Sequence, residues 1–296
     1  MLRSYLWLLL CVSLWGSNFV FGSILVQEFP PLLLAAFRLL VTTLFLLGYA
    51  YSTNRLVMIT KQDWKLLLLL GFIGTLLNQT AFFNGLKLTD ATTAALILSL
   101  TPITTAYLAS VFLGETLTKN MIVGSLIAIL GVFFVIGKGS GIHLSLGVLL
   151  IFLAMITFSC SIIIVRKLTE RLDSFITTVY ATATGTFLLI PVAFTFEPIS
   201  SGNHPLWAWL LLIATAIVMQ GICALIWNNQ LKKIGAGKAS IFLNLQPFVA
   251  MVSGFLLLGT EITIPQLMGS LLIVVGVVMG TIQVNRMKPR RIPTAS

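Results

Sequence analysis

Long apolar runs, each about the length of a membrane span, dominate the chain. Ten runs of roughly 20 residues are separated by short polar loops, and none shows the apolar–polar alternation of a barrel strand. They lie near residues 4–26, 31–52, 64–86, 91–113, 119–137, 145–166, 173–195, 206–230, 237–258 and 264–285. Because backbone groups in hydrocarbon must bond within their own segment, these runs predict ten transmembrane helices.

The second half of the chain repeats the first. Residues 84–132 match residues 229–277 at a constant offset of 145, with 16 identities in 49 positions. The identities include Asn84/Asn229, Pro102/Pro247, Gly124/Gly269 and Gly131/Gly276. Five helices per half is an odd number, so the second copy must cross the membrane in the opposite direction.

These patterns predict an all-α integral membrane protein, with ten transmembrane helices arranged as two inverted five-helix repeats. The repeats are expected at residues 1–143 and 144–296, the second with a short basic tail. Glycines such as Gly124, Gly131 and Gly276 are interpreted as close-packing positions between helices.

Composition and loop charge support this view. With 58% hydrophobic and 9% charged residues and a mean hydropathy of +1.04, the chain does not match a water-soluble globule. If the N-terminus is inside, fifteen lysines and arginines face the cytoplasm and only Lys87 and Lys138 face outward. We therefore expect a multi-pass protein of the cell membrane with both termini cytoplasmic. The basic tail is expected to meet anionic lipid, and nucleic acid is not expected as a partner.

Several short motifs resemble one family. They are Trp15-Gly16-Ser17-Asn18, Pro30-Pro31 leading to Arg38, Thr92–Pro102 leading to Gly114-Glu115, and a second copy ending in Gln246-Pro247 and Gly259–Gly276. Together they are similar to the EamA family of the drug/metabolite transporter superfamily, over essentially the whole chain. The resemblance implies a ten-helix secondary transporter, often an exporter of amino acids or related metabolites. Phe158–Ser161 departs from the pattern of Trp15–Asn18, so a symmetric substrate site is not expected.

Arg38 is the one charge that this topology places well inside a helix, about 10 Å from its outer end. Leaving a charge there costs about 2.5–3.5 kcal/mol on insertion scales. In one interpretation Arg38 faces a central cavity, where it binds a carboxylate or orders a gate. In the other it extends outward, toward Glu28, and anchors its helix.

Prolines and polar side chains within the runs supply the other candidates. Pro102 and Pro247 each free a carbonyl four residues earlier, at Leu98 and Leu243, and either line a transport site or make static kinks. Intramembrane amides either share a water-filled cavity or join helices. The predicted substrate-binding or gating residues are Trp15, Asn18, Arg38, Asn78, Gln79, Phe82, Ser99, Pro102, Tyr180, Gln220, Trp227, Asn244, Gln246 and Pro247.

The residues that are missing narrow the mechanism. All eight acids lie in loops or at helix ends, so tight coupling through a buried carboxylate is not expected. His143, His204 and the cysteines Cys11, Cys160 and Cys223 show no metal-ligand spacing, so no metal or other cofactor is predicted, and no enzyme.

The sequence therefore predicts a secondary transporter of small metabolites that works by alternating access, and the family resemblance implies that it exports amino acids or related compounds. A translocator of lipid or lipid-linked sugar is the alternative, and an integral-membrane enzyme is a weaker one. The expected partners are a small-molecule solute and membrane lipids. A monomer is expected, with a dimer as the alternative.

Overall fold

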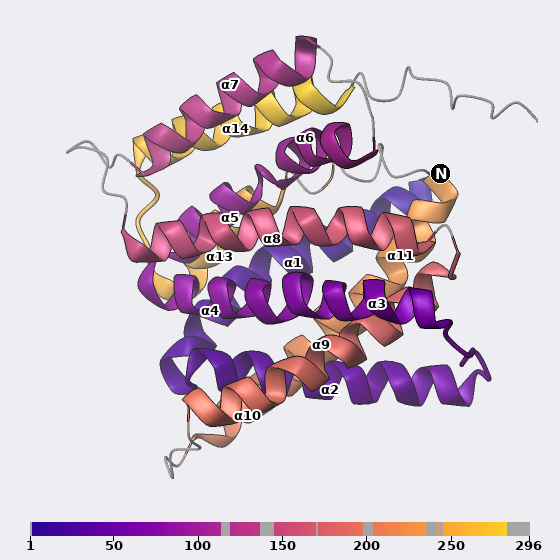
Figure 1. The fold of residues 1–296 in the computed structure, drawn as a ribbon. Coiled ribbons are helices and arrows are strands. Elements are labelled where there is room, and N and C mark those ends of the chain that lie inside the picture. Colours follow the sequence, from indigo (N-terminus) through magenta and orange to yellow (C-terminus); the bar gives the residue numbers. More distant parts are fainter. Residues whose placement is uncertain are drawn as a thin grey trace, which may run out of the picture.

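The computed structural model describes residues 2–113, 119–136, 145–169, 171–197, 204–234, 242 and 245–282. Within these ranges the chain contains helices and no strands, as the sequence predicts (Figure 1). The first half contains α1 (Leu2–Glu28), α2 (Pro31–Ser52), α3 (Lys61–Leu70), η1 (Gly71–Leu77), α4 (Asn78–Leu88), α5 (Ala91–Leu98), α6 (Thr101–Leu113) and α7 (Lys119–Ile136). The second half contains α8 (Leu146–Thr169), α9 (Ser174–Phe196), α10 (Leu206–Thr215), η2 (Ala216–Ile222), α11 (Cys223–Ile234), α13 (Gln246–Leu258) and α14 (Ile264–Ile282).

Seven helical segments of the described chain are long and apolar enough to cross a membrane. Three shorter apolar helices lie at Ile122–Gly131, Gln246–Leu258 and Ile264–Gly276. The structure therefore supports a multi-pass membrane protein, whereas a total of ten spans stays a prediction.

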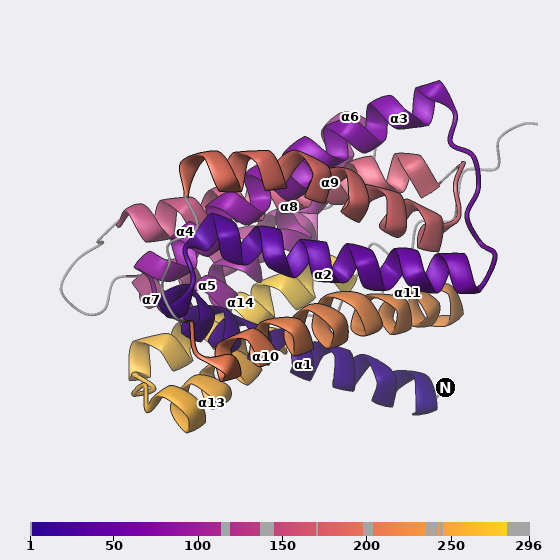
Figure 2. The same cartoon turned by 90° about the horizontal axis from the view of Figure 1, so that it is seen from below.

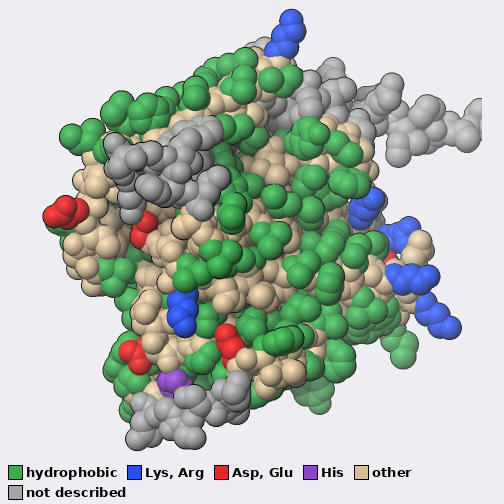
Figure 3. Space-filling view, turned by 60° about the vertical axis from the view of Figure 1, so that its left-hand side comes forward, with side chains coloured by type: hydrophobic (Ala, Val, Ile, Leu, Met, Phe, Trp, Pro, Cys, Tyr) green, Lys and Arg blue, Asp and Glu red, His purple; other side chains and the backbone are tan. Residues whose placement is uncertain are grey.

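Charged side chains separate toward two ends of the helix bundle. Figure 3 shows most of the visible acids on one side of the molecule and most of the lysines and arginines on the other, with apolar surface between them. We call the end that carries Glu28, Asp90 and Glu197 the acidic end. The opposite end, where α2 is followed by Arg55 and α3 begins with Lys61, is the basic end.

Helices α2 and α9 hold corresponding places in the two halves and pack against each other. Near the start of α2, the backbone N–H of Leu32 donates to the Glu197 carboxylate just after α9, at 2.8 Å. Further along, the hydroxyls of Thr43 and Thr186 are 2.8 Å apart. As the residue number rises along α2, the number of the contacting residue in or just after α9 falls, so the two helices run in opposite directions. Inverted repeats require this relationship.

Helices α7 and α14 also correspond and lie side by side at one edge of the bundle (Figure 1). A Cβ added to Gly131 would collide with the Gly269 backbone, and one added to Gly276 would collide with the backbone of Gly124 and Ala128. The interpretation of these glycines as close-packing positions is confirmed.

Two π-helical segments, η1 and η2, interrupt the third span of each half. Their first residues, Gly71 and Ala216, are 145 positions apart, and so are their last residues. At the end of η1 the N–H of Asn78 bonds the carbonyl of Ile73, and at the end of η2 the N–H of Cys223 bonds the carbonyl of Val218. Both bonds span five residues, as a π-helix requires.

The predicted break before Pro102 is present. Helix α5 ends at Leu98, and α6 begins at Thr101 after a turn at Ser99 and Leu100. Proline leaves the Leu98 carbonyl without its helical donor, and the Thr101 hydroxyl donates to it at 2.5 Å. The freed carbonyl predicted at Leu98 is therefore confirmed. Its counterpart Leu243 lies outside the described residues.

Candidate solute-binding site around Arg38

Arg38 lies on α2, inside the bundle, with no solvent-exposed surface. Its Nη2 donates to Asn18 Oδ1 on α1 at 2.7 Å, and its Cζ lies 5.5 Å from the centre of the Phe83 ring on α4. Nε and Nη1 have no hydrogen-bond partner among the described residues. A guanidinium carries five N–H donors, so this one retains donors for a further partner.

The interpretation that Arg38 extends outward to anchor its helix is wrong. The side chain is wholly enclosed, and its partner Asn18 lies ten residues before Glu28 on α1. Glu28 instead lines a pocket at the acidic end. Cation–π contact with Phe83 and the bond to Asn18 offset part of the cost of burying the charge.

The π segment η2 brings further polar groups to the same stretch of α2. The Thr42 hydroxyl, one turn after Arg38, has three acceptors within reach: the Arg38 carbonyl at 2.8 Å, Gln220 Oε1 at 3.1 Å and the Ala216 carbonyl at 3.2 Å. Gly221 lets η2 approach α2 closely, since a Cβ there would meet the Phe45 ring. The predicted candidate Gln220 is therefore placed one helical turn from Arg38.

Two tryptophans lie on the basic-end side of Arg38. Trp15 donates from Nε1 to the Met219 carbonyl in η2 at 2.6 Å, and its ring centre is 5.0 Å from that of Trp227. Tyr5 stacks on Phe242 at 5.7 Å nearer the start of α1. Figure 2 shows α1 and α11 running together toward this end of the bundle. These rings belong to one apolar cluster between Arg38 and the basic end.

Three phenylalanines, Phe19, Phe82 and Phe83, lie on the acidic-end side and are called the aromatic layer. The Phe19 and Phe82 ring centres are 5.9 Å apart, and those of Phe82 and Phe83 are 5.0 Å apart. Phe82 packs against both of the large apolar clusters of the bundle. The candidate Phe82 thus belongs to a wall beside Arg38, and Phe83 supplies the direct contact.

The structure brings Trp15, Asn18, Arg38, Gln220 and Trp227 together, with Phe82 in the adjoining layer. Gln246 and Pro247 lie at the start of α13, which packs on α1. A Cβ on Gly16, next to Trp15, would lie 3.0 Å from the Gln246 carbonyl. Asn244 lies outside the described residues.

Five other candidates lie in local structural contacts away from Arg38. Asn78 donates to the Ala154 carbonyl at 2.7 Å and so joins α4 to α8, and Gln79 donates to Asn78 at 3.4 Å. Ser99 bonds the carbonyl of Leu96 beside the α5–α6 break, which also contains Pro102. Tyr180 donates to the Val57 carbonyl near the basic end, at 2.8 Å. The Asn78 bond matches the interpretation of amides that join helices.

Where η1 packs on α8 and α9, the described residues contain no counterpart of the buried charge of Arg38. Instead, η1 packs closely on α8 and α9 through glycines. A Cβ added to Gly185 would collide with Thr75, and one added to Gly74 would collide with Ser161. The buried charge is therefore asymmetric in the described chain, whereas the asymmetric substrate site that the departure at Phe158–Ser161 predicts stays a prediction.

Thr42, Phe83 and Met219 are site residues that sequence reasoning missed. Thr42 follows Arg38 by one turn, which was an available signal. Met219 contributes only a carbonyl, and no side-chain pattern marks it.

No group of three metal-ligating side chains exists among the described residues.

A duplicated helical membrane bundle with a buried, partly unpaired cation is the arrangement expected of an integral membrane transporter. A family model described as the EamA-like transporter family matches residues 2–137 and again 145–282. The chain belongs to this family, as its resemblance predicts.

Similar proteins agree with this assignment. The chain is 35% identical over 216 residues to the uncharacterized transporter YyaM of Bacillus subtilis, covering 71% of this chain and 70% of that protein. It is 24% identical to the uncharacterized transporter YoaV of the same organism, over 97% of this chain and all of the other. A solved crystal structure with 19% identity superposes with a TM-score of 0.71, covering 95% of this chain and 98% of the other, which shows a shared fold.

Proposed function

We propose that this protein is a secondary transporter that exports amino acids or closely related carboxylates by alternating access, with Arg38 as the group that binds the carboxylate. The observation that carries the proposal is the enclosed guanidinium of Arg38, with Nε and Nη1 unpaired among the described residues. Arginine is suited to this role because its planar fork of donors matches a carboxylate.

The surroundings of Arg38 fit a small amphipathic solute. Asn18 and Gln220 offer amide groups, and Trp15, Trp227 and the aromatic layer surround the polar centre with rings. A lipid-linked cargo would need polar groups reachable from the bilayer, whereas Arg38 is enclosed by helices. We therefore favour a free solute over a lipid.

The assignment of direction and sidedness is part of the proposal. The basic end is taken as cytoplasmic because lysine and arginine concentrate on that side, which puts both termini inside the cell membrane. Export follows the family resemblance. Ten spans in two inverted repeats supply the two exchanging forms that alternating access needs, and transport proceeds without chemical conversion of the solute.

Counterflow in proteoliposomes tests the proposal. Vesicles are loaded with one unlabelled amino acid at a time, and entry of the trace radiolabelled form is followed. The matched amino acid amide, which lacks the carboxylate, is loaded in parallel. We expect counterflow with the amino acid and at least a tenfold lower rate with the amide.

Three variants separate binding from folding. Arg38→Met keeps an unbranched side chain of similar length without charge, Arg38→Lys keeps charge without the fork, and Arg55→Met removes an exposed arginine that follows the same helix. Arg38→Met should fold and lose counterflow, Arg38→Lys should retain part of it, and Arg55→Met should behave like the parent. Normal counterflow by a folded Arg38→Met protein would show that Arg38 does not bind solute.

A further inference from the structure

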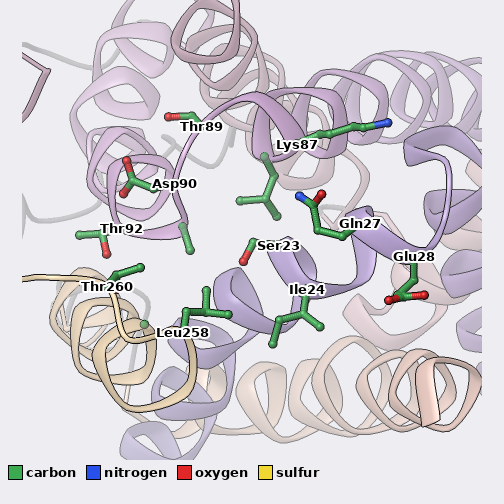
Figure 4. Close-up of a pocket in the computed structure, with 13 residues that line it drawn as sticks. Ser23, Ile24, Gln27, Glu28, Lys87, Thr89, Asp90, Thr92, Leu258 and Thr260 are labelled. Carbon is green, nitrogen blue, oxygen red and sulfur yellow. The ribbon is translucent and has the colours of Figure 1, made fainter. Parts of the chain in front are cut away.

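A pocket of about 390 Å³ opens at the acidic end, between α1, α4, α5 and α13 (Figure 4). Its volume lies at the lower end of the range for small-molecule sites, about 300–1,000 Å³. Ile24, Leu86 and Leu258 supply apolar wall, and Ser23, Thr92 and Thr260 supply hydroxyls. The lining therefore suits a small solute with an apolar body and a polar head.

The charges around this pocket differ from those around Arg38. Asp90 stands beside Thr92 and Thr260 in Figure 4, whereas Lys87 and Glu28 extend toward the opposite side of the view. Asp90 accepts hydrogen bonds from the N–H and hydroxyl of Thr93 and caps α5. The part of the pocket around Asp90 thus combines a carboxylate with hydroxyls, which favours an ammonium group.

The aromatic layer separates this pocket from Arg38. Ser23 follows Phe19 by four residues on α1, and Leu86 follows Phe82 by four on α4, so both pocket residues lie one turn nearer the acidic end. Phe83, in the same layer, faces the Arg38 guanidinium. A solute that moves from Arg38 to the acidic end by this route must pass the layer.

We propose that the acidic-end pocket is a second binding site, which takes the ammonium group of an amphipathic amine-bearing solute on the path between Arg38 and the acidic end. The inference rests on the proposed function, because that function makes the route between Arg38 and the acidic end a path for a transported solute. The two sites divide the recognition of one molecule: Arg38 binds its carboxylate, and the Asp90 side of the pocket binds its amine.

The test uses a single cysteine at Thr260, in a chain whose three native cysteines are replaced by alanine. A trimethylammonium-ethyl and a sulfonatoethyl methanethiosulfonate, one cationic and one anionic, are applied from each side of the membrane. Thr263→Cys, on the same exposed connection, is the matched control that corrects for the intrinsic reactivity of the two reagents. The cationic-to-anionic rate ratio should be at least fivefold higher at Thr260→Cys than at the control.

Two further changes assign the preference to Asp90. Asp90→Asn removes the charge but keeps an oxygen that caps α5, since asparagine is as good an N-cap as aspartate. Asp90→Asn should lower the cationic-to-anionic rate ratio at Thr260→Cys to the value of the Thr263→Cys control. Glu28→Gln, which neutralises the acid that extends away from Asp90, should leave the ratio within about twofold of the parent.

Competition shows whether an amine occupies the pocket. Phenethylamine should slow modification of Thr260→Cys, and 3-phenylpropionate, which has a similar apolar body but a carboxylate, should not. Equal protection by both compounds, protection by neither, or a cysteine that no reagent reaches from either side would overturn the proposal.

The outcome is independent of whether Arg38 binds solute. Arg38→Met should leave the reagent ratio and the amine protection unchanged, because the aromatic layer lies between the two sites. If Arg38→Met transports normally while the pocket shows its charge preference, the proposed function fails and the second site stands. If Arg38→Met loses counterflow while the pocket shows no charge preference, the second site fails and the proposed function stands.

Discussion

The guanidinium of Arg38 and the side-chain amide of Asn18 are joined by a hydrogen bond of 2.7 Å inside the bundle. An amide accepts this bond without cancelling the positive charge, whereas a carboxylate at the same place would form an ion pair. Asn18 therefore orients the guanidinium and leaves its charge available to an anionic partner.

Asn18→Asp should abolish transport while the protein stays folded. The new carboxylate would neutralise Arg38 and compete with the carboxylate of a solute, so we expect counterflow to fall more than tenfold. Thermal unfolding in detergent should occur at or above the temperature of the parent, because the variant pairs a buried charge. Parent-like counterflow by the variant would argue against a carboxylate at Arg38.

Trp15→Phe removes the indole N–H that bonds the Met219 carbonyl but keeps an aromatic ring against Trp227. The Met219 carbonyl in η2 then loses the indole donor, and we expect a destabilisation of about 0.5–1.5 kcal/mol. Trp7→Phe is the control, since Trp7 is 37% exposed near the start of α1. Thermal unfolding of the two variants should separate them, and equal unfolding temperatures would show that the Trp15 bond contributes little.

Gly185→Ala should destabilise the protein, because the added Cβ collides with Thr75 in η1. Overpacking of this kind costs about 1–3 kcal/mol. The double change Gly185→Ala with Thr75→Gly removes the obstructing side chain and should recover part of the loss.

Gly48→Ala provides the matched control for that pair, since nothing lies within 4 Å of its added Cβ. It should be neutral, or stabilising by up to about 1 kcal/mol, because alanine favours helix more than glycine. If Gly48→Ala and Gly185→Ala unfold at the same temperature, the close approach of η1 and α9 is not a tight contact.

Glu197→Ala should weaken the start of α2. The Glu197 carboxylate accepts from the N–H groups of Leu32 and Leu33, at 2.8 and 3.0 Å, at a helix whose own cap residue, Pro30, makes no side-chain bond. Loss of such a cap costs about 0.5–2 kcal/mol. Glu197→Gln keeps an acceptor oxygen and should lose less, and hydrogen exchange at Leu32 and Leu33 should distinguish the two.

The helical fold was predictable because the bilayer imposes a fixed length on each apolar run, and that constraint is visible in local sequence. The internal repeat followed from the offset of 145, and the small size of the glycines indicated close-packing positions, although not that α7 and α14 pack on each other. The two π segments were not predictable, because η1 and η2 have the same apolar composition as the α-helices around them. Only the register of their hydrogen bonds differs.

The candidate site was predictable in part for a related reason. Arg38, Asn18 and Gln220 stand out as polar residues in apolar runs, and the structure places them close together. Asn78 looked the same in sequence but lies against α8. Whether Phe82 or Phe83 contacts Arg38 depends on the rotation of α4 about its axis. This rotation was not predictable, because the π segment η1 immediately precedes α4.

The matching positions of η1 and η2 bear on the symmetry of the molecule. A π-helical turn holds more residues than the α-helical turn it replaces, so the side chains after each segment are rotated about the helix axis relative to those before it. Because the two segments begin and end at positions that are 145 apart, this rotation occurs at the same place in both halves. Among the described residues the two halves thus share a backbone irregularity, whereas the buried charge of Arg38 belongs to one half alone.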